Sequence, residues 1–370
     1  MDYHKKTLDE LSKKAAQVSQ LNGLVGFDGF IDRIMDAVDK RSGPLDDYTQ
    51  IHLISDFGNR ISSAAGMSTN IELYQKMEKL GGNGPIMANA LHHLGLNTRY
   101  LGTIGYPEIH PVFQDFAKRT NAISVAGPGV TQAVEFEDGK IMLGDMGGTY
   151  DFHYERVIEV MGEGAFFDLV SRAQLLGLVN WTMLPNCTQF FIALLEKVLP
   201  NLPQTDRRDF FFDLADPEKR SDADLRTVLT TIARFSNHGH VTLGLNLKEG
   251  QRVHHTLGLG ACETHPNALR DMCDAIRRKV GVECVVIHPT DGAVCATKMG
   301  TWYTKGPFCL KPKITTGAGD HFNSGFSLGL LLGLSPECAL TMACATSGYY
   351  VRNAKSPSIA DLQTFISTWS

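Results

Sequence analysis

A glycine-rich stretch near the carboxyl end of the chain, KITTGAGDHFNSGF at residues 313–326, contains the residue types best suited to chemistry on a phosphate. Gly317 and Gly319 allow backbone conformations that expose successive N–H groups, and they precede an apolar segment with helical spacing. Because the amino end of a helix carries about half a positive charge, this turn predicts an anion cradle.

Asp320 stands in the first turn of that predicted helix, beside the anion cradle. One interpretation is a helix N-cap, which aspartate fills well and which contributes about 1 kcal/mol. The other is a general base that takes a proton from a hydroxyl group while neighbouring amides hold the phosphoryl group under attack. A carboxylate beside a bound phosphate otherwise repels it, so this placement favours the second interpretation.

The composition argues against several other kinds of protein. The chain has 370 residues, of which 43% are hydrophobic, and a net charge of -5 without a cluster of Lys and Arg, so a nucleic-acid partner is not expected. Its longest apolar run, residues 325–334, is about half as long as a membrane-spanning helix. The amino terminus lacks the apolar core of a signal peptide, and none of the eight cysteines forms a C-x-x-C pair. We therefore expect a cytoplasmic protein with no membrane partner.

The elements that must position the glycine-rich stretch alternate between strand and helix. Apolar runs of strand length occur at LLGLVNWTML, RRDFFFDLA, HVTLGLNL and ECVVIHP, with amphipathic segments between them. This alternation predicts a parallel sheet with helices on both faces. Upstream, residues 23–39 begin as a buried strand, IELYQKMEKL at 71–80 has a helix-like pattern, and Asp138-Gly139 predicts a hairpin.

Three motifs together resemble the ribokinase-like (PfkB-type) family of carbohydrate and nucleoside kinases. TTGAGDHFNSGF at 315–326 is similar to its C-terminal signature, GGN at 81–83 to its N-terminal motif, and NLKE at 246–249 to its N-x-x-E motif. The motifs occur in the family's order, and the similarity begins near residue 22. The resemblance implies one α/β domain over 1–370, a three-layer α/β/α sandwich. A small antiparallel β lid would come from about 33–50 and 97–150, and its sheet is a plausible surface for a homodimer.

The resemblance implies an enzyme that transfers the γ-phosphoryl group of ATP to a hydroxymethyl group of a sugar or sugar-like molecule. Asp320 would be the base, and the amides of Gly317, Ala318 and Gly319 would hold the transferring group. The acceptor would be bound by Gly81, Gly82, Asn83 and one aspartate of the first strand, Asp28 or Asp32. Both aspartates can face one side of a strand, and their spacing from Gly26 favours Asp32.

For the nucleotide side, the resemblance implies contacts from Asn246, Thr290, Gly292 and Asn323. Asn246 and Glu249 would organise Mg²⁺, through water because this ion gives up its waters reluctantly. The other interpretation of this pair is a turn cap, and Asn83 before Gly84-Pro85 is likewise a ready helix N-cap.

The chain also departs from the family's pattern. Ile314 occupies the position where the family usually has an Asp that helps bind an activating monovalent cation, which leaves a requirement for that cation open. HPTDG at 288–292 replaces the more usual Thr-x-Gly of the nucleotide site. A nucleoside kinase and a non-catalytic ligand-binding descendant are the alternative functions. Retention of Asp320 speaks against the second, and the sequence does not name the acceptor.

Overall fold

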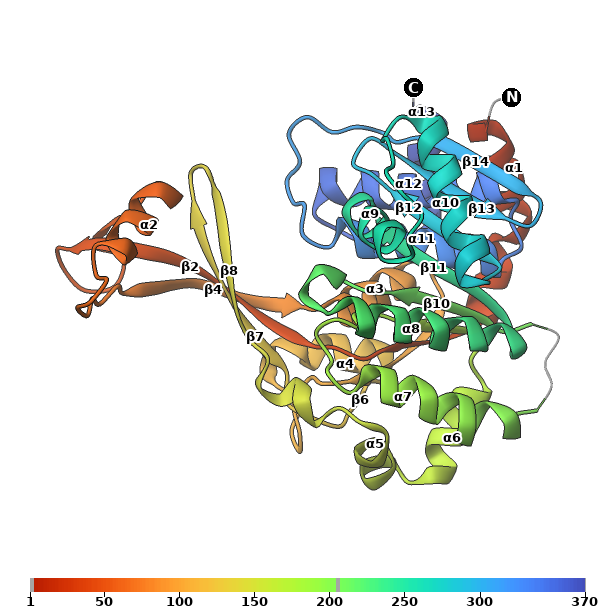
Figure 1. Cartoon of the computed structure of the whole chain (residues 1–370), viewed down its shortest axis with the longest axis horizontal. Helices are drawn as coiled ribbons and strands as arrows, with labels where there is room; N and C mark the ends of the chain where they lie inside the picture. Colours follow the sequence, from red (N-terminus) through yellow and green to blue (C-terminus); the bar gives the residue numbers. More distant parts are fainter. Residues whose placement is uncertain (1–2, 204–206, 370) are drawn as a thin grey trace.

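A computed structural model describes residues 3–203 and 207–369. Figure 1 shows a body built around a large sheet and an arm that extends well away from it. The nine strands of the large sheet lie in the order β14 (Gly300–Lys305), β13 (Gly292–Thr297), β12 (Cys284–His288), β11 (His240–Asn246), β10 (Asp209–Asp213), β9 (Leu175–Leu178), β1 (Asn22–Gly26), β5 (Asn97–Gly102) and β6 (Ile123–Ser124). Neighbours from β12 to β6 are parallel, whereas β13 and β14 are antiparallel.

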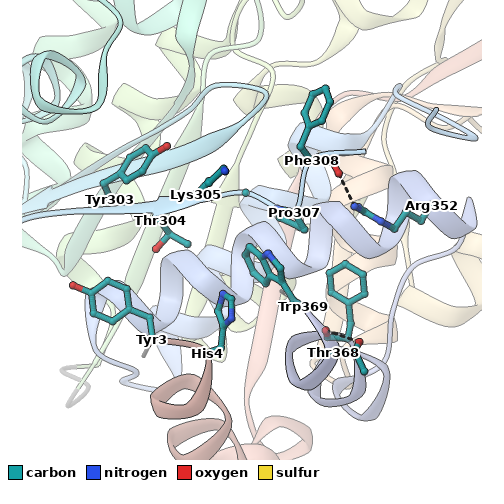
Figure 2. A pocket seen from close by; sticks show the side chains of 12 residues that line it. Tyr3, His4, Tyr303, Thr304, Lys305, Pro307, Phe308, Arg352, Thr368 and Trp369 are labelled. Carbon is teal, nitrogen blue, oxygen red and sulfur yellow. Dashed lines mark hydrogen bonds between the residues drawn. The ribbon is translucent and has the colours of Figure 1, made fainter. Parts of the chain in front are cut away.

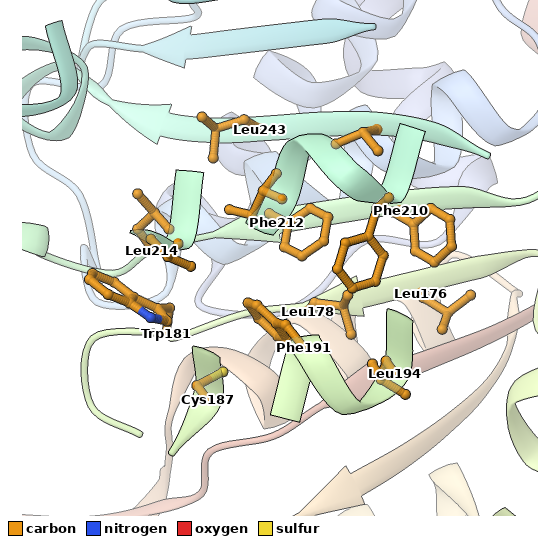
Figure 3. Packing of buried hydrophobic residues seen from close by; sticks show 14 of the residues in the cluster. Leu176, Leu178, Trp181, Cys187, Phe191, Leu194, Phe210, Phe212, Leu214 and Leu243 are labelled. Carbon is orange, nitrogen blue, oxygen red and sulfur yellow. The ribbon is translucent and has the colours of Figure 1, made fainter. Parts of the chain in front are cut away.

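The central strands are apolar because both of their faces are covered. All residues of β9 and β10 are buried, and side chains of β10 alternate between the two sides of the sheet. Phe210 and Phe212 pack on one side with Phe191, whose ring centroid lies 5.3 Å from that of Phe212 (Figure 3). Phe211 belongs to the core on the other side.

Two layers of helices complete the sandwich. One face of the sheet packs against α5 (Tyr154–Met161), α6 (Glu163–Ser171), α7 (Cys187–Ala193), α8 (Asp222–Arg234), α9 (Leu247–Thr256) and α10 (Pro266–Val280). The other packs against α1 (Tyr3–Lys14), α3 (Asn83–His93), α4 (Gln114–Thr120), α11 (Ala318–Leu331), α12 (Pro336–Asn353) and α13 (Ile359–Thr368). The predicted three-layer sandwich is confirmed. Among the residues described, no helix combines the length and the apolar character that crossing a bilayer requires.

The arm is a second sheet that carries its own small core. Its strands are β2 (Phe30–Arg41), β3 (Tyr48–Gln50), β4 (Leu73–Gly81), β7 (Gly129–Phe136) and β8 (Gly139–Asp145), and α2 (Ile54–Ser62) lies at its far end (Figure 1). The hairpin predicted at Asp138-Gly139 joins β7 to β8. Phe57 of α2 packs with Phe136, which anchors the end of the arm.

Three expectations for this region were wrong. The sheet of the arm is mixed rather than antiparallel, because β2 pairs in parallel with β7, and the arm does not take in all of 97–150. Of the stretch 97–150, residues 97–102 and 123–124 form β5 and β6 of the large sheet, where β5 pairs in parallel with β1. The helix-like stretch 71–80 lies largely in β4, which pairs antiparallel with the long strand β2. Pairing along β2 overrides the local helical pattern, because an isolated helix gains less stabilising free energy than a strand that completes a ladder of hydrogen bonds and side-chain pairs.

Candidate active site

Polar side chains collect at the edge where the parallel strands of the large sheet end. Asp213, Asn246 and His288 are the last residues of β10, β11 and β12. Asp28 and Asn180 each follow a strand by two residues, after β1 and β9. Carboxyl ends of parallel strands share one edge, and ligands of open α/β sheets bind there. The topology therefore places these five side chains around one site.

The predicted anion cradle lies at the start of α11. Gly317 is the N-cap residue, with φ of 89°, a left-handed conformation that glycine adopts without strain. Thr316 lies just before it, and its hydroxyl accepts a hydrogen bond at 2.8 Å from Lys140 of the arm. The backbone N–H of Ala318 donates to the Thr315 carbonyl at 3.1 Å, so one of the three predicted amides closes the turn itself.

Asp320 is the third residue of α11 and does not cap it, because the cap position belongs to Gly317. The residue is 7% exposed, and its carboxylate accepts a hydrogen bond of 2.8 Å from the side chain of Asn83. Burial, helped by the charges of Asp28 and Glu249, raises the pKa of Asp320 to about 8, although the hydrogen bond from Asn83 opposes the shift. A buried carboxylate with such a pKa has the character of a group that accepts a proton near neutral pH.

Asp28 is fully buried and committed to the start of α3. Its carboxylate accepts hydrogen bonds from the N–H of Asn83 at 2.9 Å, the N–H of Gly84 at 2.7 Å and the side chain of Asn180 at 2.7 Å. Burial raises its pKa to about 6, although these bonds oppose the shift. The N-cap residue of α3 is Gly82, so the interpretation of Asn83 as the N-cap was wrong. Asp28 supplies the capping carboxylate from another element, which leaves the Asn83 side chain for Asp320.

Asp32 is the aspartate that faces open space. It lies in β2 and lines two adjoining cavities of about 460 and 540 Å³ between the arm and the loop before α11. Burial raises its pKa, and the charges of Lys79 and Lys140 lower it. Gly81 lies diagonally across the ladder on β4, and a Cβ added there would come within 2.5 Å of the Asp32 carboxylate. Glycine at 81 therefore leaves room for this carboxylate to meet a ligand.

A third cavity, of about 490 Å³, lies on the other side of the anion cradle. Five of the residues predicted for the nucleotide and the phosphate line it, namely Asn246, Thr290, Gly292, Ala318 and Gly319. His288 and Phe322 form a ring pair on its wall, with centroids 4.5 Å apart. This apolar wall suits the base of a nucleotide.

Asn323 does not reach this cavity. It is 1% exposed, and its side chain donates to the Asp213 carboxylate at 2.6 Å. The expectation that Asn323 contacts the nucleotide is therefore not supported by its position. The residue points instead beneath the site, where it fixes Asp213 at the end of β10.

Asn246 and Glu249 form a reciprocal cap at the start of α9. The Asn246 side chain accepts from the N–H of Glu249 at 3.0 Å, and the Glu249 carboxylate accepts from the N–H of Asn246 at 2.8 Å. The other Glu249 oxygen accepts from the N–H of Asp216 at 2.9 Å. The turn-cap interpretation of this pair is thus realised. Among the described residues, no group of three or more His, Cys, Asp or Glu side chains could hold a metal ion.

A further cavity, of about 760 Å³, lies beside both ends of the chain (Figure 2). Arg352 donates to the Phe308 carbonyl at 2.8 Å, and the segment 306–308 forms a wall shared with the cavity of about 490 Å³. His4 stacks on Trp369 at the other end. The predicted site residues, all of which the structure describes, lie elsewhere.

Two residues of the site, Asp213 and Asn180, were missed by the sequence reasoning. Each follows a strand-length apolar run directly, as in FFFD and LGLVN. That signal was available, because a polar residue at the carboxyl end of a parallel strand points to the ligand edge. His321 and Tyr350, which contact the anion cradle, gave no comparable signal.

Comparisons with known proteins agree with this geometry. A family model described as prokaryotic ketohexokinase matches residues 5–369. A ketohexokinase of Haloferax volcanii is 26% identical over 349 residues, covering 93% of this chain and 90% of the relative. Among solved structures, a carbohydrate kinase from Agrobacterium tumefaciens has a TM-score of 0.63 at 19% identity, over 94% of this chain and 97% of its own. Ribokinase of Arabidopsis thaliana, complexed with ribose and ATP, has a TM-score of 0.63 at 14% identity, over 95% of this chain and 99% of its own.

Proposed function

The chain belongs to the prokaryotic ketohexokinase family, and from this premise we propose that its acceptor is a ketohexose. It is an ATP-dependent sugar kinase. The observation that carries the proposal is the buried Asp320 carboxylate at the start of α11, next to the cavity lined by Gly319 and near the Asn83 side chain. The match to a ketohexokinase favours a ketose over a nucleoside as acceptor.

In the proposed reaction, Asp320 takes the proton of a hydroxymethyl group of the sugar. The hydroxymethyl oxygen forms a bond to the γ-phosphorus of ATP while the bond from that phosphorus to the bridging oxygen breaks, and ADP leaves. The amides at the start of α11 hold the charge that spreads over the phosphoryl oxygens. Asn83 keeps the Asp320 carboxylate oriented by its hydrogen bond of 2.8 Å.

Asp32 is the proposed ligand of the sugar hydroxyls. Its carboxylate lines the cavities under the arm, whereas that of Asp28 accepts three hydrogen bonds from within the protein. Carboxylates bind neighbouring hydroxyls well because both oxygens accept hydrogen bonds. Gly81 would leave the space that this contact needs.

Mg²⁺ is the proposed metal, held through its waters and the phosphates of ATP. Burial raises the pKa of Asp213 and Glu249, and in Asp213 the charges of Glu249 and Asp320 add to the effect. The three buried acids, Asp213, Glu249 and Asp320, repel one another when they are charged, and a divalent cation would supply the counter-charge. Asp213 and Glu249 would orient its waters, and the ion would neutralise the phosphate charge.

Two broader proposals complete the assignment. The arm is the proposed surface for a homodimer, because Ile61, Met77 and Leu143 are exposed there. A cytoplasmic location is supported by the cysteines, all eight of which are free in the described structure.

A coupled ADP-release assay with Mg²⁺ and ATP tests the function. Ketohexoses, aldohexoses, ribose and adenosine would be compared at equal concentration. We expect the highest kcat/KM for a ketohexose and a product whose ³¹P signal is coupled to a CH₂ group. Preference for adenosine would replace the proposal with a nucleoside kinase, and turnover of no acceptor would favour a binding protein.

A further inference from the structure

Two carbonyl groups of the anion cradle are held by side chains from outside the loop. The Tyr350 hydroxyl donates to the Thr316 carbonyl at 3.0 Å. The His321 Nδ1 lies 2.7 Å from the Gly317 carbonyl. The two rings are stacked, with centroids 3.6 Å apart and planes 14° from parallel. Both contacts act on the turn that presents the phosphate-binding amides, so they fix its position relative to α11 and α12.

The protonation of His321 follows from its partners. A carbonyl oxygen only accepts hydrogen bonds, so Nδ1 carries the proton and donates to Gly317. Burial lowers the pKa of His321 to about 4, and the ring is therefore neutral near pH 7. Nε2 then accepts from the Ser356 hydroxyl at 2.9 Å, and that hydroxyl accepts from the Asn89 side chain at 3.3 Å. Each member has a partner of the correct polarity, which makes the arrangement rigid.

These contacts occupy the region where the ribokinase-like family implies a monovalent cation. Such an ion needs several oxygen ligands, yet Ile314 offers none from its side chain. The carbonyls of Thr316 and Gly317 already accept hydrogen bonds. Lys79, Arg119 and Lys355 line the adjoining cavity of about 460 Å³ against a single carboxylate, that of Asp32, so the balance of charge there repels cations. The residues present do not fit a monovalent cation.

We propose that His321 and Tyr350 position the phosphate-binding loop in place of a monovalent cation, so that the kinase works without potassium. The inference rests on the proposed function of the loop as the cradle of the transferring phosphoryl group. Both residues are positioning residues, since neither donates to the phosphate itself. A small displacement of the loop would move its amides away from the transferring group, and an error of about 1 Å in such a site costs up to ~10²-fold in rate.

Tyr350→Phe tests the hydroxyl contact, with Tyr349→Phe as the matched control. Both changes remove one hydroxyl from the same helix, but the ring of Tyr349 packs against Phe365 of α13 instead. Hydrogen exchange of the peptide covering 313–322 should become faster in Tyr350→Phe and stay unchanged in Tyr349→Phe. Equal exchange in the two variants would overturn the positioning role, and this readout does not depend on finding the acceptor.

His321→Phe keeps the ring stack and removes the donor to Gly317. We expect kcat to fall by roughly 10- to 100-fold, with the KM for ATP nearly unchanged and with faster exchange of 313–322. His321→Gln, whose amide can donate to the same carbonyl, should recover part of kcat. Wild-type kcat and exchange in His321→Phe would overturn the inference.

The cation itself is tested with wild-type enzyme in potassium and tetramethylammonium salts at equal ionic strength, so that screening is constant. We expect equal kcat in the two salts. A several-fold stimulation by potassium would overturn the inference and leave the kinase assignment intact. An enzyme inactive on every acceptor in both salts would instead contradict the proposed function, while hydrogen exchange would still decide the positioning role.

Discussion

Replacing Asp320 with Asn is expected to abolish phosphoryl transfer and, at neutral pH and above, to stabilise the fold. The carboxylate is buried and its pKa is raised to about 8. A raised carboxyl pKa means that the folded state holds the proton more tightly than the unfolded chain. Stability is therefore lost as pH rises from the ordinary pKa through 8, by several kcal/mol at 1.36 kcal/mol per pKa unit. Asn carries no charge and keeps an oxygen to accept from Asn83.

The same change should lower the activity, although it raises the stability of the fold. Loss of the base is expected to lower kcat by at least ~10²-fold. In the wild type, kcat/KM should rise as pH rises through the Asp320 pKa, because the base must first lose its proton. The residual rate of Asp320→Asn should not show this rise with pH.

The assay combines ADP release with thermal unfolding over the same series of pH values. Asp271→Asn is the control, since Asp271 is exposed on α10 and should alter neither measurement. Near-wild-type kcat in Asp320→Asn would refute the assignment of the base. Lost activity together with a melting temperature that is lowered equally at every pH would show a packing role instead.

Three further changes test the acceptor and metal ends. Asp32→Ala should raise the acceptor KM by roughly 10- to 100-fold, the value of a lost charged hydrogen bond, with the KM for ATP unchanged in steady-state kinetics. Gly81→Ala should act in the same direction, because its Cβ would lie 2.5 Å from the Asp32 carboxylate, whereas Gly164→Ala, with open space around it, should match the wild type. Glu249→Gln should raise the Mg²⁺ concentration for half-maximal rate; an unchanged Mg²⁺ titration would remove Glu249 from the metal site.

Features that depend on a short stretch of chain could be predicted from the sequence. The turn at Gly317, the hairpin at Asp138-Gly139 and the apolar strand β10 each follow from neighbouring residues. The three-layer sandwich follows from the alternation of such strands with amphipathic helices. Thr290 and Gly292 line the same cavity as Ala318 and Gly319, as the order of the motifs led us to expect, and their contact with a nucleotide stays a prediction.

Features that depend on partners distant in the sequence could not be predicted from it. The helix-like stretch 71–80 lies mostly in strand β4 because β2 lies beside it, and nothing within those ten residues records that neighbour. Asn323 looked like a nucleotide ligand, yet the Asp213 carboxylate from another element accepts its side chain. The contacts of Tyr350 and His321 join residues up to 35 positions apart, with α11 and α12 between them in the sequence, and no spacing rule links them.

Asp28 shows how the separate motifs become one site. Its carboxylate fixes the backbone of Asn83, and the side chain of Asn83 fixes Asp320, so a residue after the first strand orients the proposed base near the other end of the chain. The arm joins the body at this same point, since β2 begins at Phe30 and β4 ends at Gly81. The carboxylate that carries this chain of contacts is fully buried, and removing it would leave two backbone N–H groups without their acceptor. In the proposed reaction Asp28 would therefore act on the acceptor site through the geometry of α3, and Asp32 would act on it by direct contact.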